Sequence, residues 1–229
     1  FYHAVSVVGG ENGFLIALDG RPARTPGKAL LASPTRRLAD AIAAEWAAQE
    51  GSIDPRTMPI TRLMNSAIDH VASRLSEVIA DIVRYAGSDL ICYRAEAPGE
   101  LMGRQGRAWD PVLAWAKGRL GVCFSVTRGV MPVEQSAEAV AAVGRAIEGR
   151  GQFEVAALHV MTSLLGSVLL AIAHAEGLLS TEAAWCAAHV DEDWQAEQWG
   201  SDADAAARKA YRLSEFEAAS LIFKESAGR

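Results

Sequence analysis

The stretch VAALHVMTSLLGSVLLAIAHA, residues 155–175, is the strongest candidate for a membrane span in this 229-residue chain. Its length would suffice, since a transmembrane helix needs about 20 apolar residues. Polar and small residues interrupt it at six positions: His159, Thr162, Ser163, Gly166, Ser167 and His174. We therefore predict that residues 152–176 form a buried central helix of a soluble protein, with further helices packed around it.

The sequence on both sides of this stretch repeats the apolar spacing of helices. We expect helices near 60–73, 75–85, 98–120, 134–149, 181–199 and 202–223. Ser180 and Asp202 are suitable N-caps, and Gly200 is a suitable stop. Pro111 interrupts the 98–120 segment, so we predict a kink or a second helix start with Asp110 as its N-cap.

The N-terminal residues have a different pattern. Short β-prone runs at 4–8 and 14–18 flank a glycine-rich turn, and Asp19-Gly20 is a favoured pair for a tight hairpin. Ser33 and Pro34 then suit the N-cap and first residue of a helix. The predicted fold class is α+β, with a small β-containing N-terminal domain (residues 1–55) followed by a larger, mainly α-helical bundle domain (residues 56–229).

Composition excludes several classes of function. The net charge of −6 and the pI of about 5.4 argue against nucleic acid or an anionic membrane as the main partner. Cys92, Cys123 and Cys186 form no CxxC pair, which argues against a zinc knuckle and is typical of a reducing compartment. The sequence begins with Phe1, which leaves room for a removed targeting segment.

The segment VDEDWQAEQWG, residues 190–200, concentrates acids and tryptophans. His189, Asp193 and Glu197 share one helix face, but they would span about 12 Å along it, so one ion could bind at most an adjacent pair. We therefore favour a solvated face, with a local pair between His189 and Asp193, over a metal site. No cofactor is expected.

Two other functions remain for this segment. A small hydrolase would use Glu192 or Glu197 as an acid–base group, but this chemistry needs a second carboxylate across a cleft. A protein-binding surface would use Trp194 and Trp199 among acids that attract a basic partner. Alternatively, Trp194 faces the core. We also expect acids near the C-terminal end of the helix to oppose its dipole, an indication that they serve binding rather than stability.

A series of motifs along the chain resembles one protein family. In order, they are Leu18-Asp19-Gly20-Arg21-Pro22, Thr25-Pro26, Ala43-Ala44-Glu45-Trp46, Met58-Pro59-Ile60-Thr61, Asp89-Leu90-Ile91-Cys92-Tyr93-Arg94-Ala95, Trp109-Asp110-Pro111 and the Gln-Trp-Gly that ends at Gly200. Together they resemble the assembly chaperones of the F-type ATP synthase that escort the α subunit of its catalytic head.

The resemblance implies a chaperone rather than an enzyme. It would bind the unassembled ATP synthase α subunit and prevent its aggregation until β subunits replace it. The compartment would be the bacterial cytoplasm, or the mitochondrial matrix in a eukaryote. The family's important acidic residue matches Glu192, with Asp191 and Asp193 as alternative registers. Gln195 and Trp199 would lie beside it at the contact.

Overall fold

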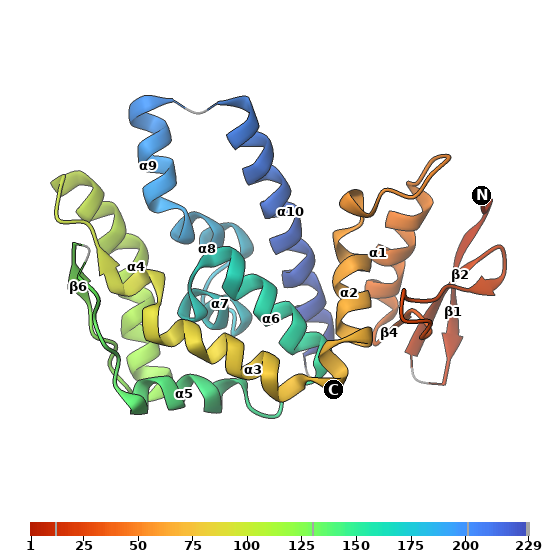
Figure 1. Cartoon of the computed structure of the whole chain (residues 1–229), viewed down its shortest axis with the longest axis horizontal. Coiled ribbons are helices and arrows are strands. Elements are labelled where there is room, and N and C mark those ends of the chain that lie inside the picture. The colour runs from red at the N-terminus through yellow and green to blue at the C-terminus, as the bar shows by residue number, and fades with distance from the viewer. Residues whose placement is uncertain (12, 130, 201, 228–229) are drawn as a thin grey trace. The chain divides into compact units, whose positions relative to one another are not determined.

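The computed structural model describes residues 1–11, 13–129, 131–200 and 202–227 (Figure 1). It confirms the α+β class, with a small N-terminal sheet and mostly helices after it. The chain divides into two compact units. Unit 1 contains residues 1–75, 150–157 and the C-terminal segment from residue 214, whereas unit 2 contains residues 76–149 and 158–213. The domain boundary after residue 55 stays a prediction.

The sheet of unit 1 is built on the predicted hairpin. Strand β1 (Val5–Gly10) pairs antiparallel with β2 (Gly13–Leu18). Strand β3 (Arg21–Pro22) follows the turn at Asp19-Gly20, where both residues have positive φ, and also pairs with β2. The Asp19 carboxylate accepts hydrogen bonds from the backbone N–H groups of His3 and Ala4, which lowers its pKa.

The first helix begins later than predicted. Ser33 lies in strand β4 (Ala32–Ser33), which pairs with β2, so Ser33 is not a helix cap. Helix α1 (Arg36–Ala47) has Thr35 as its N-cap, and the Thr35 hydroxyl oxygen accepts from Leu38 N–H at 3.2 Å. The prediction that Ser33 and Pro34 start the first helix was wrong, because Ser33 belongs to a strand that pairs with β2.

Helix α2 (Pro59–Asp69) is capped by a side chain from another helix. Glu45 of α1 accepts from the backbone N–H groups of Ile60 and Thr61, both at 2.7 Å, and from the Thr61 hydroxyl at 2.6 Å. Burial raises the pKa of Glu45, although these three donors oppose the shift. Glu45 therefore joins α1 to the start of α2.

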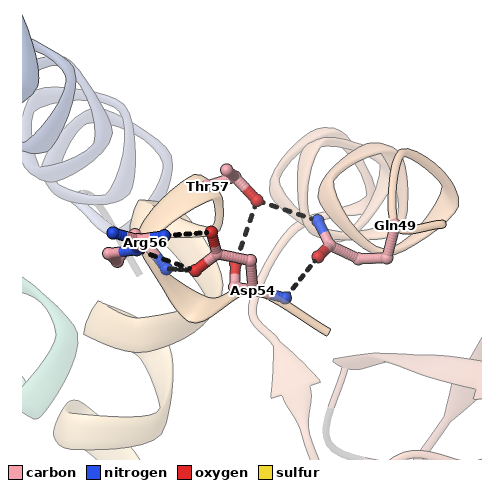
Figure 2. Close-up of polar contacts among 4 residues, drawn as sticks. All are labelled: Gln49, Asp54, Arg56 and Thr57. Atoms are coloured by element: carbon pink, nitrogen blue, oxygen red, sulfur yellow. Dashed lines mark hydrogen bonds and ion pairs between the residues drawn. The ribbon is translucent and has the colours of Figure 1, made fainter. Parts of the chain in front are cut away.

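The segment between these helices is held by side chains (Figure 2). Gln49 accepts from Asp54 N–H at 2.8 Å and donates to the Thr57 hydroxyl at 3.0 Å. Asp54 caps the short helix η1 (Pro55–Thr57) and pairs with Arg56. At the end of α2, the Asp69 carboxylate accepts from the Thr25 hydroxyl and from the backbone N–H of Gly27.

Unit 2 is mostly helical. Its elements include η3 (Tyr85–Ser88), η4 (Leu90–Cys92), α4 (Gly99–Leu120), α5 (Ala137–Ile147), α8 (Thr181–Ala188) and α9 (Val190–Trp199), and most of α3 (Leu75–Arg84). Helices α6 (Gln152–Leu165) and α10 (Ala203–Ser226) contribute residues to both units, and η2 (Val71–Ser73) belongs to unit 1. Strands β5 (Tyr93–Arg94) and β6 (Thr127–Arg128) form a short parallel pair. Within the described residues, none of the helices combines the length and apolarity that a membrane crossing requires.

The apolar stretch 155–175 is buried as predicted, but it forms two helices. Gly166, with φ of 64°, ends α6, and Ser167 caps α7 (Val168–Ala175) by accepting from Leu170 N–H at 3.0 Å. Asp89 is fully buried beside this break and accepts from Leu169 N–H at 3.0 Å. Burial raises the pKa of Asp89 to about 6.

Helix α4 continues through Pro111, so the predicted restart at Asp110 was wrong. The Asp110 carboxylate accepts from the Arg94 guanidinium at 2.8 Å instead of capping a helix. Beside it, Trp109 is buried and its indole N–H donates to the Ala187 carbonyl at 2.6 Å. Helix α4 packs against α7, α8 and α9, and packing of this kind can offset the cost of a proline inside a helix.

Candidate functional site

The acidic segment lies at the start of a helix rather than at its end. The predicted helix 181–199 is divided at His189 into α8 and α9, which places Asp191, Glu192 and Asp193 in the first turn of α9. Acids at a helix N-terminus are stabilised by the helix dipole. The expectation that they oppose the dipole was therefore wrong. The predicted stop is confirmed, since Gly200 N–H donates to the Ala196 carbonyl at 2.8 Å.

His189 is a buried structural residue. Its ring is 2% exposed, Nδ1–H donates to the Trp185 carbonyl at 2.8 Å, and its centroid lies 3.9 Å from that of Trp185. Burial lowers the pKa of His189. The predicted pair of His189 with Asp193 was wrong, because Asp193 pairs with Lys209 of α10. In the part of the chain that the structure describes, no three metal-ligating side chains are grouped to hold an ion.

The three consecutive acids differ in their contacts. Asp191 accepts from the Gln105 side-chain amide at 2.7 Å, and Asp193 is paired with Lys209. The Glu192 side chain is 58% exposed, and its contacts with His189 and Arg212 are both long, at 3.9 Å. Glu192 is therefore the most available of the three carboxylates for a partner.

The two tryptophans of α9 have opposite environments. Trp194 is buried, and the Arg104 guanidinium lies 4.8 Å from the centre of its ring. Arg104 also binds Glu197 at 2.8 Å, and this hydrogen bond lowers the pKa of Glu197. Trp199 at the end of the helix is 78% exposed. The alternative prediction, that Trp194 faces the core, is therefore confirmed, whereas Trp199 is available for contact.

An open pocket of about 510 Å³ lies between α9 and the first turns of α10. Four residues predicted at the contact line it: Glu192, Asp193, Gln195 and Trp199. Its other lining residues come from both helices and from the link between them: Ala196, Gly200, Asp202, Ala205, Ala206 and Lys209. Asp191 lines a different pocket together with Gln105 and the segment from Tyr93 to Ala97. The structure thus brings together four of the five predicted residues and separates Asp191 from them.

The sequence interpretation did not include residues of α10 in the candidate site, although the sequence indicates them. Positions 202, 205, 206 and 209 have the spacing of one helix face, and this face completes the pocket. Residues 158–207 also contain no lysine or arginine, but they contain eight acids: Glu176, Glu182, Asp191, Glu192, Asp193, Glu197, Asp202 and Asp204. Such a run gives this segment a net negative charge, which favours basic partner surfaces.

Comparisons with known proteins agree on one family. The family model described as ATP12 chaperone protein matches residues 1–117. Mitochondrial protein atp12 of Schizosaccharomyces pombe is 26% identical over 214 residues, which cover 88% of this chain and 73% of that protein.

Solved structures match over nearly the whole chain. Atp12 from Paracoccus denitrificans is 38% identical with a TM-score of 0.90, covering 99% of this chain and 97% of its own. A lysine-for-aspartate mutant of the same protein has a TM-score of 0.89. A protein from Agrobacterium tumefaciens, proposed to be a chaperone, is 48% identical with a TM-score of 0.92, covering 98% of this chain and 85% of its own.

Proposed function

Because this chain belongs to the ATP12 family of ATP synthase assembly chaperones, we propose that its client is the unassembled α subunit of the F1 sector. The chaperone prevents aggregation of this subunit until β subunits replace it. A free subunit of a ring exposes apolar surface that its neighbours normally cover, which makes it prone to aggregate. The compartment we propose is the bacterial cytoplasm, or the mitochondrial matrix in a eukaryote.

The observation that carries this proposal is the exposed acidic start of α9. Glu192 is exposed at 58%, while Gln105 and Lys209 hold the carboxylates on either side of it. A charge presented in this way attracts a basic patch on the client. Charged contacts at a rim speed association and select partners without requiring extreme affinity. This property suits a chaperone that must later release its client.

Trp199 supports contact at the same place. A tryptophan exposed at 78% presents a large apolar surface beside the acids, and tryptophan is enriched among residues that dominate binding energy. Gln195 lies on the same face of α9 as Glu192 and Trp199, four positions from the tryptophan. We therefore assign the contact to Glu192, Gln195 and Trp199, with Asp191 and Asp193 as the acids that flank it.

We propose that the protein works without catalytic turnover or a bound cofactor. The alternative, a hydrolase that uses Glu192 or Glu197, has less support. The Arg104 hydrogen bond lowers the pKa of Glu197, which favours the ionised form over a proton donor at neutral pH. The Glu192 side chain is 58% exposed, whereas acid–base catalysis by a carboxyl pair needs a second carboxylate across a cleft.

The test follows aggregation of purified α subunit by light scattering after dilution from denaturant. The wild-type chain at equimolar amount should suppress the scattering, whereas Glu192→Lys should fail to do so while it remains folded. Glu182→Lys is a matched control, because Glu182 is also an exposed acid in the first turn of a helix, α8. Glu182→Lys places a positive charge at a helix N-terminus, as Glu192→Lys does, so it should destabilise its helix to a similar extent while still suppressing aggregation.

Two results would contradict the proposal. If the wild type leaves the scattering unchanged, the α subunit is not the client. If the purified chain hydrolyses ATP, and Glu192→Gln abolishes this activity in a folded protein, the hydrolase alternative replaces the chaperone.

A further inference from the structure

The pocket between α9 and α10 is built from two matching helix faces. Most of the lining follows one stripe on each side: positions 192, 195, 196 and 199 of α9, and position 202 just before α10 with 205, 206 and 209 within it. Asp193 and Gly200 complete the lining. Both sets have the spacing i, i+3, i+4, i+7 of a single helix stripe. In a closed pair of helices, such facing stripes carry large apolar side chains that fill the space between them.

Here the space is not filled. Three of the lining positions, 196, 205 and 206, carry only alanine, and a volume of about 510 Å³ stays open. Trp199, the one large apolar side chain among the lining residues, is 78% exposed. An exposed indole beside an unfilled apolar pocket is unfavourable in the isolated protein, and a side chain from another molecule would remove both defects.

The charges around the pocket restrict which side chain enters. Lys209, the only basic lining residue, is paired with Asp193. Asp202 is exposed at the start of α10, where its carboxylate accepts from Ala205 N–H at 2.6 Å. Glu192 and Asp202 therefore leave a negative rim around an apolar interior. A partner segment with the complementary pattern has an apolar centre and basic flanks.

We propose that this pocket receives one large apolar side chain of the client, from a segment in which lysine or arginine lies within two or three positions of it. The indole of Trp199 covers the inserted side chain, while Glu192 and Asp202 pair with the flanking cations. The volume lies within the range of roughly 300–1,000 Å³ that is typical of binding pockets. This proposal rests on the proposed function, because the client segment belongs to the α subunit.

The first experiment fills the pocket from within. Ala206→Leu places a larger apolar side chain in it, whereas Ala207→Leu makes the same change at the next position of α10, which is equally exposed but does not line the pocket. Affinity of each full-length variant for purified α subunit is measured by titration. We expect Ala206→Leu and Trp199→Ala each to weaken binding at least tenfold, equal to about 1.4 kcal/mol, and Ala207→Leu to leave it unchanged.

The second experiment identifies the occupant. A photo-crosslinking amino acid at position 195, which lines the pocket and is exposed, is activated in the complex with α subunit, and the crosslinked peptide is sequenced. A peptide with an apolar residue between basic neighbours supports the proposal. An acidic or uniformly polar peptide overturns it.

The two proposals fail in different ways. Absence of wild-type binding to α subunit overturns the proposed function and this inference with it. Wild-type binding that Ala206→Leu and Trp199→Ala leave unchanged overturns the pocket alone. Circular dichroism of each variant confirms that a loss of binding occurs in a folded chain.

Discussion

Replacement of Gln105 by leucine should destabilise unit 2 and release the start of α9. Gln105 is 1% exposed and links two segments of the chain. Its side-chain oxygen accepts from Ala95 N–H at 2.9 Å, and its side-chain nitrogen donates to the Asp191 carboxylate at 2.7 Å. Leucine has a similar volume, so the change removes both hydrogen bonds without opening a large cavity.

The magnitude follows from these two bonds. A neutral hydrogen bond contributes about 1 kcal/mol and one to a charged group about 1.5–3 kcal/mol. Ala95 and Asp191 are half-buried, so water compensates in part, and we expect a net loss of about 2–3 kcal/mol in the free energy of unfolding. At about 2–4 °C per kcal/mol for a chain of this size, the melting temperature should fall by about 5–10 °C.

The assay combines urea unfolding with hydrogen exchange. The amide of Ala95 should exchange faster in Gln105→Leu, because it loses its acceptor. A double-mutant cycle with Asp191→Asn should show a coupling energy above about 1 kcal/mol. A coupling below about 0.5 kcal/mol, or an unchanged exchange rate at Ala95, would refute the assignment of Gln105 as the link to α9.

A second buried glutamine supplies the control. Gln135 is 7% exposed and binds both backbone groups of Ser125 at 2.8 Å, within unit 2 but without a hydrogen bond to α9. Gln135→Leu should lower stability by about 1–2 kcal/mol through the loss of two neutral bonds. Of the two variants, only Gln105→Leu should also weaken binding to α subunit, because Gln105 binds the Asp191 carboxylate of α9 whereas Gln135 binds Ser125. Equal weakening by both variants would indicate an effect of stability alone.

Three further predictions concern stability. Burial raises the folded pKa of Asp89 from 3.8 to about 6, so its contribution to stability should be fully present below pH 4 and fall by up to roughly 3 kcal/mol as the pH rises through 6. The stability difference between wild type and Asp89→Asn, measured from urea midpoints, should follow this pH dependence. Glu45→Ala removes the acceptor for two backbone N–H groups at the start of α2. It should lower the free energy of unfolding, measured in urea, by about 2–3 kcal/mol, and a loss under about 1 kcal/mol would contradict the capping role. Trp109→Phe loses the bond to the Ala187 carbonyl and should cost about 1–3 kcal/mol in the same assay, and a neutral result would show that the bond is replaced.

The contacts explain why distant motifs of the resemblance occur together. Glu45 of one motif caps the helix that begins in the motif containing Thr61. Arg94 of another motif binds Asp110 and lies 5.0 Å from the centre of the Trp109 ring. Each pair is separated by about sixteen positions in the chain, so the motifs are structural partners rather than separate functional signatures.

Local patterns were sufficient to predict much of the fold. The hairpin around Asp19, the helix stop at Gly200 and the burial of residues 155–175 all follow from backbone preference or apolar periodicity, which are properties of neighbouring residues. The break at Gly166 was missed although glycine followed by serine is a signal for one helix end and the next helix start. The division at His189 has no comparable local signal.

Tertiary structure alone decided how the acids of α9 differ. Asp191, Glu192 and Asp193 are equivalent in the sequence, and only the positions of Gln105 and Lys209 show that Glu192 is the available one. The sequence left open whether Trp194 binds a partner or faces the core, and the structure buries Trp194 beside Arg104 of α4 while Trp199 is exposed. The physical reason is that periodicity reports which face of a helix is apolar, whereas pairing and exposure depend on which distant side chain the fold brings against that face.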